Sequence, residues 1–167
     1  KPEYRSQTTT GIVVTAEQTT TVNFTLYPDT PVAPVIASDS VAISTYSIMW
    51  TWTDNSTVES GYRLRIPNSA IGISSDTVVA DLSANTTTYQ NINLSPNTSY
   101  TMYVEAYNII GSSKSQVVNV WTLANLPLKT SVVSVSSVVI SVQWSANNNP
   151  SWTQYRIYQS TKNDFSS

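Results

Sequence analysis

Cysteine and histidine are both absent from the 167 residues of this chain. Without cysteine it can form no disulfide, no thiolate zinc site and no thiol nucleophile. Without histidine it has neither an imidazole base nor an imidazole metal ligand. Glycine is scarce, at 4 residues, and no glycine-rich phosphate loop or G-x-S-x-G motif occurs. We therefore expect a protein that is not an enzyme, with no catalytic residue, no cofactor and no metal site.

Charge is also sparse. Charged residues make up 11% of the chain, against a usual share of about 25%. The net charge is -2 and there is no basic run, so we expect no nucleic-acid partner. No apolar stretch approaches the roughly 18 residues of a spanning helix, so we expect no membrane span. Serine, threonine and asparagine replace the missing ions, which favours an extracellular or cell-surface location.

What the sequence does contain is short runs with a period of two, separated by clusters of Asn, Asp, Gly, Pro and Ser. Such runs predict β-strands, and many of them at this spacing predict an antiparallel sandwich or barrel. The predicted strands span 11–16, 20–26, 34–40, 47–53, 61–66, 77–82, 86–92, 99–108, 117–123, 131–136, 138–145 and 153–159.

Two proline-containing linker segments divide the chain. "YPDTPVAP" (27–34) and "LANLPLK" (123–129) both interrupt strand pairing, because proline lacks the amide donor. One complete unit, residues 31–124, lies between them. Residues 1–28 and 127–167 are too short for complete units of the same kind.

The segment "LSPNTSYTMYVEAYN" (94–108) fixes the orientation of one strand. Tyr100 shares a face with Met102 and Val104, whereas Glu105 points to the opposite face. Tyr100 therefore points inward, and its buried hydroxyl needs a hydrogen-bond partner. The turn at Pro96 can offer a backbone group, which is the tyrosine corner of sandwich domains.

These features together resemble a fibronectin type III domain. The matching pieces are the proline-bounded start at 31–34, Trp52, Tyr62, "LSPNTSY", "VEAYN", Gly111 and the closing "VWTLA". The resemblance implies an all-β, antiparallel, immunoglobulin-like β-sandwich of two sheets and seven strands. The core residues that we expect on this basis are Trp50, Trp52, Tyr62, Leu94 and Tyr100.

The two flanks resemble pieces of further sandwiches. In residues 127–167, Trp144 matches Trp52 and Tyr155 matches Tyr62, as in the N-terminal half of a second fibronectin type III domain. Residues 1–28 resemble the last strands of a carboxypeptidase-regulatory-like domain, with a hairpin that turns at "AEQ". We therefore expect a tandem array in a bacterial extracellular protein, with neighbouring β-sandwiches of the same or adjacent chains as partners.

In the loop after Trp52, the carboxylates Asp54 and Glu59 lie near each other. The pair could be an acid–base pair or, with Asn55 and Ser56, a calcium loop. The alternative is a polar loop in which Asp and Asn make local turns. We favour the polar loop, because the EF-hand spacing is missing.

The outward face of the complete unit is the candidate binding site. With neighbouring strands paired as in the family, one exposed sheet surface carries Arg63, Arg65, Tyr103, Glu105, Tyr107 and Trp121. Its aromatic planes could stack on sugar rings or anchor a surface protein. Alternatively, the arginine stems cover the rings in a structural ladder, and this is the interpretation that we favour.

The function that we expect is a non-catalytic spacer or adhesion segment of a long modular extracellular protein. Three alternatives stay open: an accessory module of a secreted hydrolase, a carbohydrate- or protein-binding module, and a filament subunit that assembles by strand complementation between chains. Glycosylation sequons, relevant only in a host that uses them, begin at Asn23, Asn55, Asn85, Asn93 and Asn97.

Overall fold

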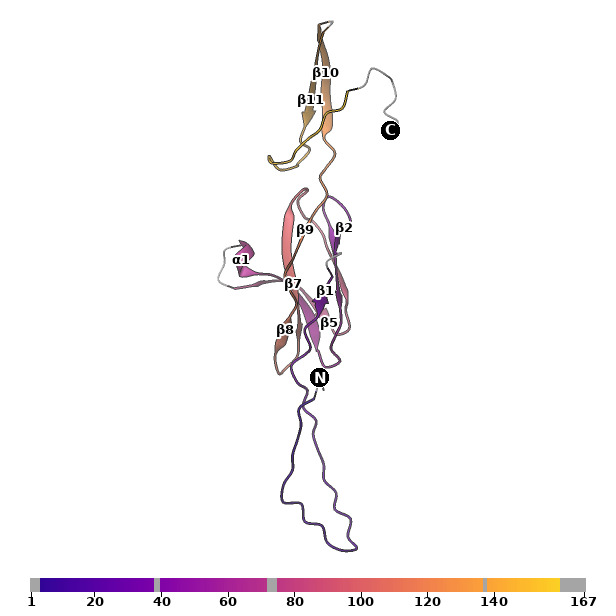
Figure 1. Ribbon diagram of the computed structural model, residues 1–167, viewed down its shortest axis with the longest axis vertical. Helices are drawn as coiled ribbons and strands as arrows, with labels where there is room; N and C mark the ends of the chain where they lie inside the picture. The colour runs from indigo at the N-terminus through magenta and orange to yellow at the C-terminus, as the bar shows by residue number, and fades with distance from the viewer. Residues whose placement is uncertain (1–3, 38–39, 72–74, 137, 160–167) are drawn as a thin grey trace.

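Two antiparallel sheets form the central body in the computed structural model, which describes residues 4–37, 40–71, 75–136 and 138–159 (Figure 1). The first, 4-stranded sheet contains β1 (Val35–Ile36), β2 (Val41–Ala42), β3 (Ile48–Thr53) and β6 (Thr88–Asn91). The second, 5-stranded sheet contains β4 (Gly61–Ile66), β5 (Thr77–Ser83), β7 (Ser99–Tyr107), β8 (Ser112–Lys114) and β9 (Val118–Trp121). The predicted all-β antiparallel sandwich is confirmed.

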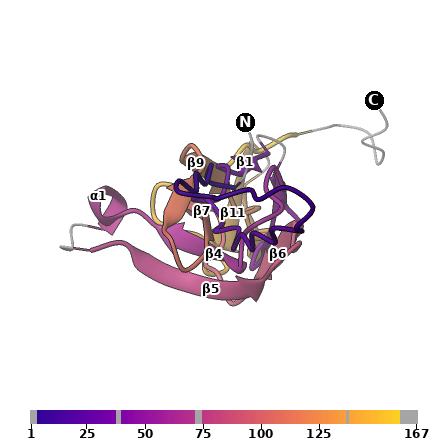
Figure 2. The same ribbon diagram turned by 90° about the horizontal axis from the view of Figure 1, so that it is seen from below.

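The connections between these strands add one helical turn, α1 (Asn68–Ile71), which projects to one side of the sandwich (Figure 2). Neither α1 nor β8 was predicted. Both are shorter than the windows in which periodicity can be recognised.

The core lies between the two sheets and follows the alternation of the strands. In β3, Ile48 and Trp50 are fully buried and Trp52 is 4% exposed. In β4, Tyr62 and Leu64 are fully buried. These side chains form one cluster with inward residues of β7 and β9, and Leu94 and Tyr100 pack against its edge.

Two tyrosine hydroxyls are tied down at the margins of this core. The Tyr100 hydroxyl accepts a hydrogen bond from the backbone N–H of Ser95 at 2.8 Å, which confirms the tyrosine corner. The Tyr62 ring lies 5.8 Å from the Trp52 ring, centroid to centroid, and its hydroxyl donates to Asp54 Oδ1. The two tyrosine rings thus contribute apolar area while their hydroxyls stay paired.

Residues 4–28 form an arm that extends from one end of the sandwich (Figure 1). The predicted turn is present at Ala16 and Glu17, but the predicted strands 11–16 and 20–26 are wrong, because the two legs form no ladder there. Within the described part of the arm, backbone pairing between the legs is confined to the Tyr4–Pro28 bridge and its neighbours. Alternating apolar residues do not make a strand without a second strand at hydrogen-bonding distance.

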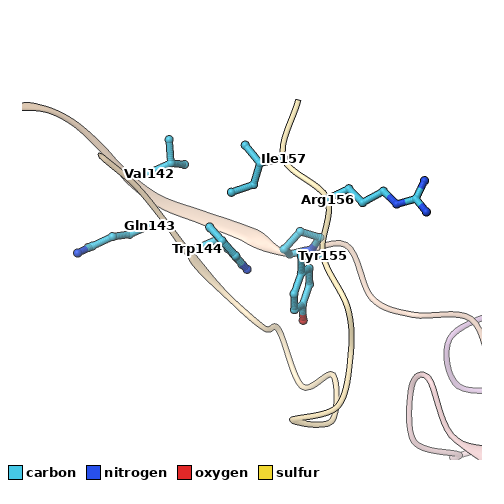
Figure 3. Close-up of a pocket in the computed structure, with 7 residues that line it drawn as sticks. Val142, Gln143, Trp144, Tyr155, Arg156 and Ile157 are labelled. Carbon is cyan, nitrogen blue, oxygen red and sulfur yellow. The ribbon is translucent and has the colours of Figure 1, made fainter. Parts of the chain in front are cut away.

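At the opposite end, β10 (Leu128–Ser136) and β11 (Val139–Ser145) form a two-stranded ribbon (Figure 1). The predicted strand 153–159 is absent, since the segment has no ladder partner. It nevertheless places Tyr155 against Trp144, with ring centroids 5.9 Å apart at 59° (Figure 3). This repeats the Trp52–Tyr62 pair, whose rings are 5.8 Å apart at 50°.

The repeated ring pair of the tail is much less covered than the original. Trp144 is 38% exposed, whereas Trp52 is 4% exposed. Trp144 and Tyr155, with Val142 and Ile157, line an apolar hollow of about 220 Å³ (Figure 3). The apolar side chains around this hollow are therefore only partly covered.

Candidate functional site

The candidate site lies on the outward face of the second sheet, where β4 runs between β5 and β7. Arg63 stands opposite Asp81 of β5 and Glu105 of β7, and Arg65 stands opposite Tyr103. Because side chains alternate along a strand, all of these residues project from the same face.

The first cluster on this face joins Arg63, Tyr107 and Asp81. The Arg63 guanidinium carbon lies 3.7 Å from the centre of the Tyr107 ring, and its Nε lies 3.0 Å from Asp81 Oδ2. The Tyr107 hydroxyl donates to Asp81 Oδ1 at 2.7 Å. This hydroxyl, followed by Arg63, holds the pKa of Asp81 below its usual value. The cation covers the ring face that a ligand would stack on.

The second cluster joins Tyr103, Lys114 and Asp76. Lys114 Nζ lies 4.8 Å from the centre of the Tyr103 ring and 3.0 Å from Asp76 Oδ2. The Tyr103 hydroxyl also donates to Asp76 Oδ2, and the Asn68 backbone N–H donates to Asp76 Oδ1 at 2.9 Å. These donors, the Tyr103 hydroxyl first, hold the pKa of Asp76 well below its ordinary range. Desolvation, and then the Asp76 carboxylate, raises the pKa of Tyr103.

A buried ion pair lies in the same ladder. Arg65 Nε and Glu105 Oε2 are 2.7 Å apart, with side chains 21% and 7% exposed. The pair is ionic in character, because the two atoms are not aligned as a hydrogen bond. The other oxygen, Glu105 Oε1, accepts from the Ser112 hydroxyl at 2.7 Å. In this nearly dry position one Glu105 oxygen thus lies beside the Arg65 cation and the other is bonded to the Ser112 hydroxyl.

Two residues of this face are less exposed than we expected. Tyr103 is 3% exposed and Glu105 is 6% exposed, although both were expected on an exposed surface. The Lys114 side chain lies over the Tyr103 ring, and the Arg65 side chain lies beside the Glu105 carboxylate. These long side chains cover two positions that the alternation alone predicts to be exposed. The contacts of Arg63 over Tyr107 and of Lys114 over Tyr103 are of the kind that a structural ladder requires.

Trp121 stands apart from this ladder. It lies on β9, opposite Ser99 at the start of β7, whereas Tyr103 and Tyr107 lie further along that strand. Its side chain is 55% exposed, so it is the member of the predicted surface whose ring stays open to solvent. Trp121 does not share a cluster with Arg63 or Arg65.

Three charged partners of these residues were not predicted as site residues: Asp76, Asp81 and Lys114. The sequence could have predicted Asp81, because this residue points outward from strand 77–82, which pairs with the strand of Arg63. Asp76 precedes β5, and Lys114 lies in β8, so neither carried a periodicity signal.

The loop after β3 behaves as a polar turn. Asp54 Oδ1 accepts from the Ser56 backbone N–H at 3.0 Å and from the Tyr62 hydroxyl, while Glu59 Oε1 accepts from the Asn85 backbone N–H at 3.4 Å. The two carboxylates thus bond to different parts of the fold, Asp54 to its own loop and β4, and Glu59 to the turn between β5 and β6. In the part of the chain that the structure describes, acidic side chains do not gather in the groups of three that could hold a metal ion.

The sandwich geometry agrees with a family model. The model of the fibronectin type III domain matches residues 30–121, which is more than half of the 167 residues. The chain belongs to the fibronectin type III family. Fibronectin type III domains generally serve as structural, spacer or adhesion modules of modular proteins, and they are typically non-catalytic. They commonly occur outside the cell and next to other domains.

Solved fibronectin type III structures resemble the chain at a distance. The chicken CNTN1 FN1–FN3 domains share 22% identity at a TM-score of 0.47, over 57% of this chain and 34% of that one. The domain of human fibronectin type III domain containing protein 3 shares 23% at a TM-score of 0.46, over 59% and 92%. The FN5 domain of Drosophila Lar shares 20% at a TM-score of 0.44, over 57% and 99%. No curated protein matches the chain.

Proposed function

We propose that this chain is a non-catalytic spacer segment in a tandem array of β-sandwiches within an extracellular, modular bacterial protein. The observation that carries the proposal is the elongated layout, in which the arm and the tail leave the sandwich from opposite ends (Figure 1). A domain connected in this way adds its length to the array. Among the described residues, no helix is long and apolar enough to cross a membrane.

The N-terminal linker is anchored to the sandwich, as a spacer requires. Asn108 Nδ2 donates to the backbone oxygens of Asp29 at 2.8 Å and Val58 at 3.0 Å. Asn108 Oδ1 accepts from the backbone N–H groups of Ile110 at 2.8 Å and Gly111 at 3.2 Å. One amide therefore binds the linker to two loops at this end of the body, which limits how the preceding segment can bend.

The tail supports the tandem arrangement. Its Trp144–Tyr155 pair has nearly the geometry of Trp52–Tyr62, yet it borders a hollow instead of a closed core. We propose that residues 127–167 are the N-terminal half of a second fibronectin type III domain. We further propose that residues 1–28 end a preceding carboxypeptidase-regulatory-like sandwich, whose closing strands would pair with sequence upstream.

A display experiment tests the spacer role. The chain is anchored on a cell surface and carries a reporter domain at its outer end, and capture of the reporter by a bulky antibody is measured. We expect capture to fall when residues 31–124 are deleted and to recover when an unrelated fibronectin type III domain of similar length replaces them. If the unrelated domain does not restore capture, a specific surface of this sandwich matters and the spacer role is wrong.

Adhesion through Trp121 is the second candidate, because this ring is 55% exposed on the outward face. An open indole can stack on a sugar ring or anchor a surface protein. A glycan array and a pull-down from surface extracts, each with wild type and Trp121→Ala, test the idea. Loss of a signal in Trp121→Ala would support adhesion, and equal binding by both proteins would exclude it. Tyr158→Ala, at a residue that is 73% exposed in the tail, is the matched control.

A further inference from the structure

The joint between the sandwich and the tail is built from asparagine side chains. The linker residue Asn125 and the tail residue Asn149 form a reciprocal pair: the Asn125 backbone N–H donates to Asn149 Oδ1, and Asn149 Nδ2 donates to the Asn125 backbone oxygen, both at 2.7 Å. Asn149 is only 8% exposed. The Asn149 side chain thus binds both backbone groups of the linker residue Asn125. Because Asn149 is nearly buried, these hydrogen bonds lie in a partly dry environment, where they are strong.

The side chain of Asn125 extends the contact in both directions. Its Nδ2 donates to the Tyr46 hydroxyl of the sandwich at 2.7 Å and to the Asn147 backbone oxygen of the tail at 2.8 Å. Asn147 Nδ2 in turn donates to the Leu126 backbone oxygen at 2.9 Å. The Asn125 amide therefore bridges the sandwich and the tail, and the Asn147 amide binds the next linker residue, Leu126.

A direct contact bypasses the linker. Asn97, in the turn before β7, donates from Nδ2 to the Thr153 hydroxyl of the tail at 2.9 Å. The Asn97 backbone N–H also donates to the Leu123 backbone oxygen at 3.0 Å. Asn97 and Asn147 have positive φ values of 45° and 52°, a conformation that asparagine tolerates better than most residues. This explains why the same residue type recurs on both sides of the joint.

We propose that Asn125, Asn147 and Asn149 form a neutral amide lock that holds the tail in one orientation relative to the sandwich. Every group in the contacts above is an amide, a hydroxyl or a backbone group. The orientation is therefore independent of ionic strength and of pH over the range in which the sandwich stays folded, in contrast to a joint made of ion pairs. The proposal deepens the spacer role, because a spacer has a defined reach only if its joints have defined angles.

Distance measurements between two spin labels test the lock. The chain has no cysteine, so the pair Gln90→Cys and Ser141→Cys places one label on the sandwich and one on the exposed face of the tail ribbon. We expect one narrow distance distribution that is unchanged between about 0.05 and 1 M salt. A broad distribution in the unmodified joint would overturn the lock, whatever the display experiment shows about the spacer role.

Variants of the lock sharpen the test. Asn149→Ala should broaden the distance distribution. Tyr46→Phe should also broaden it, because it removes the hydroxyl that accepts from Asn125 Nδ2, and this residue of the sandwich has no part in the fold of the tail. Asn148→Gly, at an exposed neighbour that also has a positive φ, is the matched control and should leave it narrow. An unchanged distribution in both Asn149→Ala and Tyr46→Phe would overturn the proposal.

Asn149→Asp gives a readout that a merely structural role would not. At neutral pH the carboxylate retains the acceptor for the Asn125 N–H but has no donor for the Asn125 backbone oxygen, so the distribution should broaden. Below about pH 4 the protonated acid regains one donor and should narrow it again. Wild type at the same pH is the control, and an Asn149→Asp distribution that does not respond to pH would contradict the assigned contacts.

Discussion

The Arg65–Glu105 ion pair makes the sharpest test of whether the outward face is a structural ladder. Replacing Arg65 by methionine keeps most of the apolar stem and removes the cation. The nearly buried Glu105 carboxylate then keeps the Ser112 hydroxyl as its hydrogen-bond donor, with Arg63 and Lys114 opposite it on the neighbouring strands. Removing one partner of a buried pair typically costs about 3–5 kcal/mol. Because Arg65 is 21% exposed and water can partly replace it, we expect the lower value, about 3 kcal/mol.

Urea unfolding followed by tryptophan fluorescence measures this loss, since Trp50 and Trp52 lie in the core. With a slope of about 1.5 kcal/mol per M for a domain of this size, 3 kcal/mol lowers the midpoint by about 2 M. Such a loss is a large part of the roughly 5–15 kcal/mol that stabilises a typical domain.

The same strand offers a matched control. Arg63→Met removes an identical side chain, but the Arg63 and Asp81 side chains are 31% and 50% exposed. An exposed pair of this kind, with its cation–π contact, is worth about 1 kcal/mol. The double change Arg65→Met with Glu105→Leu removes both buried charges and should lie within about 1 kcal/mol of wild type. The ladder interpretation is wrong if Arg65→Met costs no more than Arg63→Met, or if the double variant is as unstable as the single one.

Three further predictions concern the same domain. Tyr100→Phe removes the acceptor of the Ser95 N–H and should cost about 0.5–1.5 kcal/mol in a urea titration, whereas Tyr158→Phe, in an exposed position, should cost nothing measurable. Gly61→Ala would force a methyl group against the Leu82 backbone oxygen and should lower the thermal midpoint by several degrees; an unchanged midpoint would contradict the close approach. The folded-state pKa of Asp76 lies below its unfolded value, so its contribution is complete above about pH 4 and is lost as the pH falls further. Asp76→Asn should therefore flatten the acid limb of the stability curve, and parallel curves for the two proteins would refute this.

The alternation of side chains predicted the interior of the sandwich well. It gave the bounds 61–66 of β4 as the structure has them, and it placed Tyr100 at the corner. These features depend on short-range rules, namely period two, turn residues and the need to pair a buried hydroxyl.

What the alternation could not predict depends on which segments lie side by side. Strand 20–26 has the right pattern but lacks a partner strand, so it forms no ladder. Tyr103 has outward parity, yet Lys114 of a short and unpredicted strand covers its ring. Parity gives the direction of a side chain, whereas its burial also depends on the length and position of its neighbours across the sheet.

The distribution of the few charges along the molecule follows a physical logic. The ion pairs described above lie on the outward face of the second sheet, where they cover apolar rings and include carboxylates with lowered pKa values. The contacts at the two ends of the sandwich, around Asn108 and Asn125, use amides and hydroxyls instead. Acid therefore acts first on the stability of the body, through Asp76 and Asp81, and salt weakens its exposed pairs. Neither condition changes the amides and hydroxyls that hold the arm and the tail to the sandwich, so the directions of both should persist for as long as the sandwich stays folded.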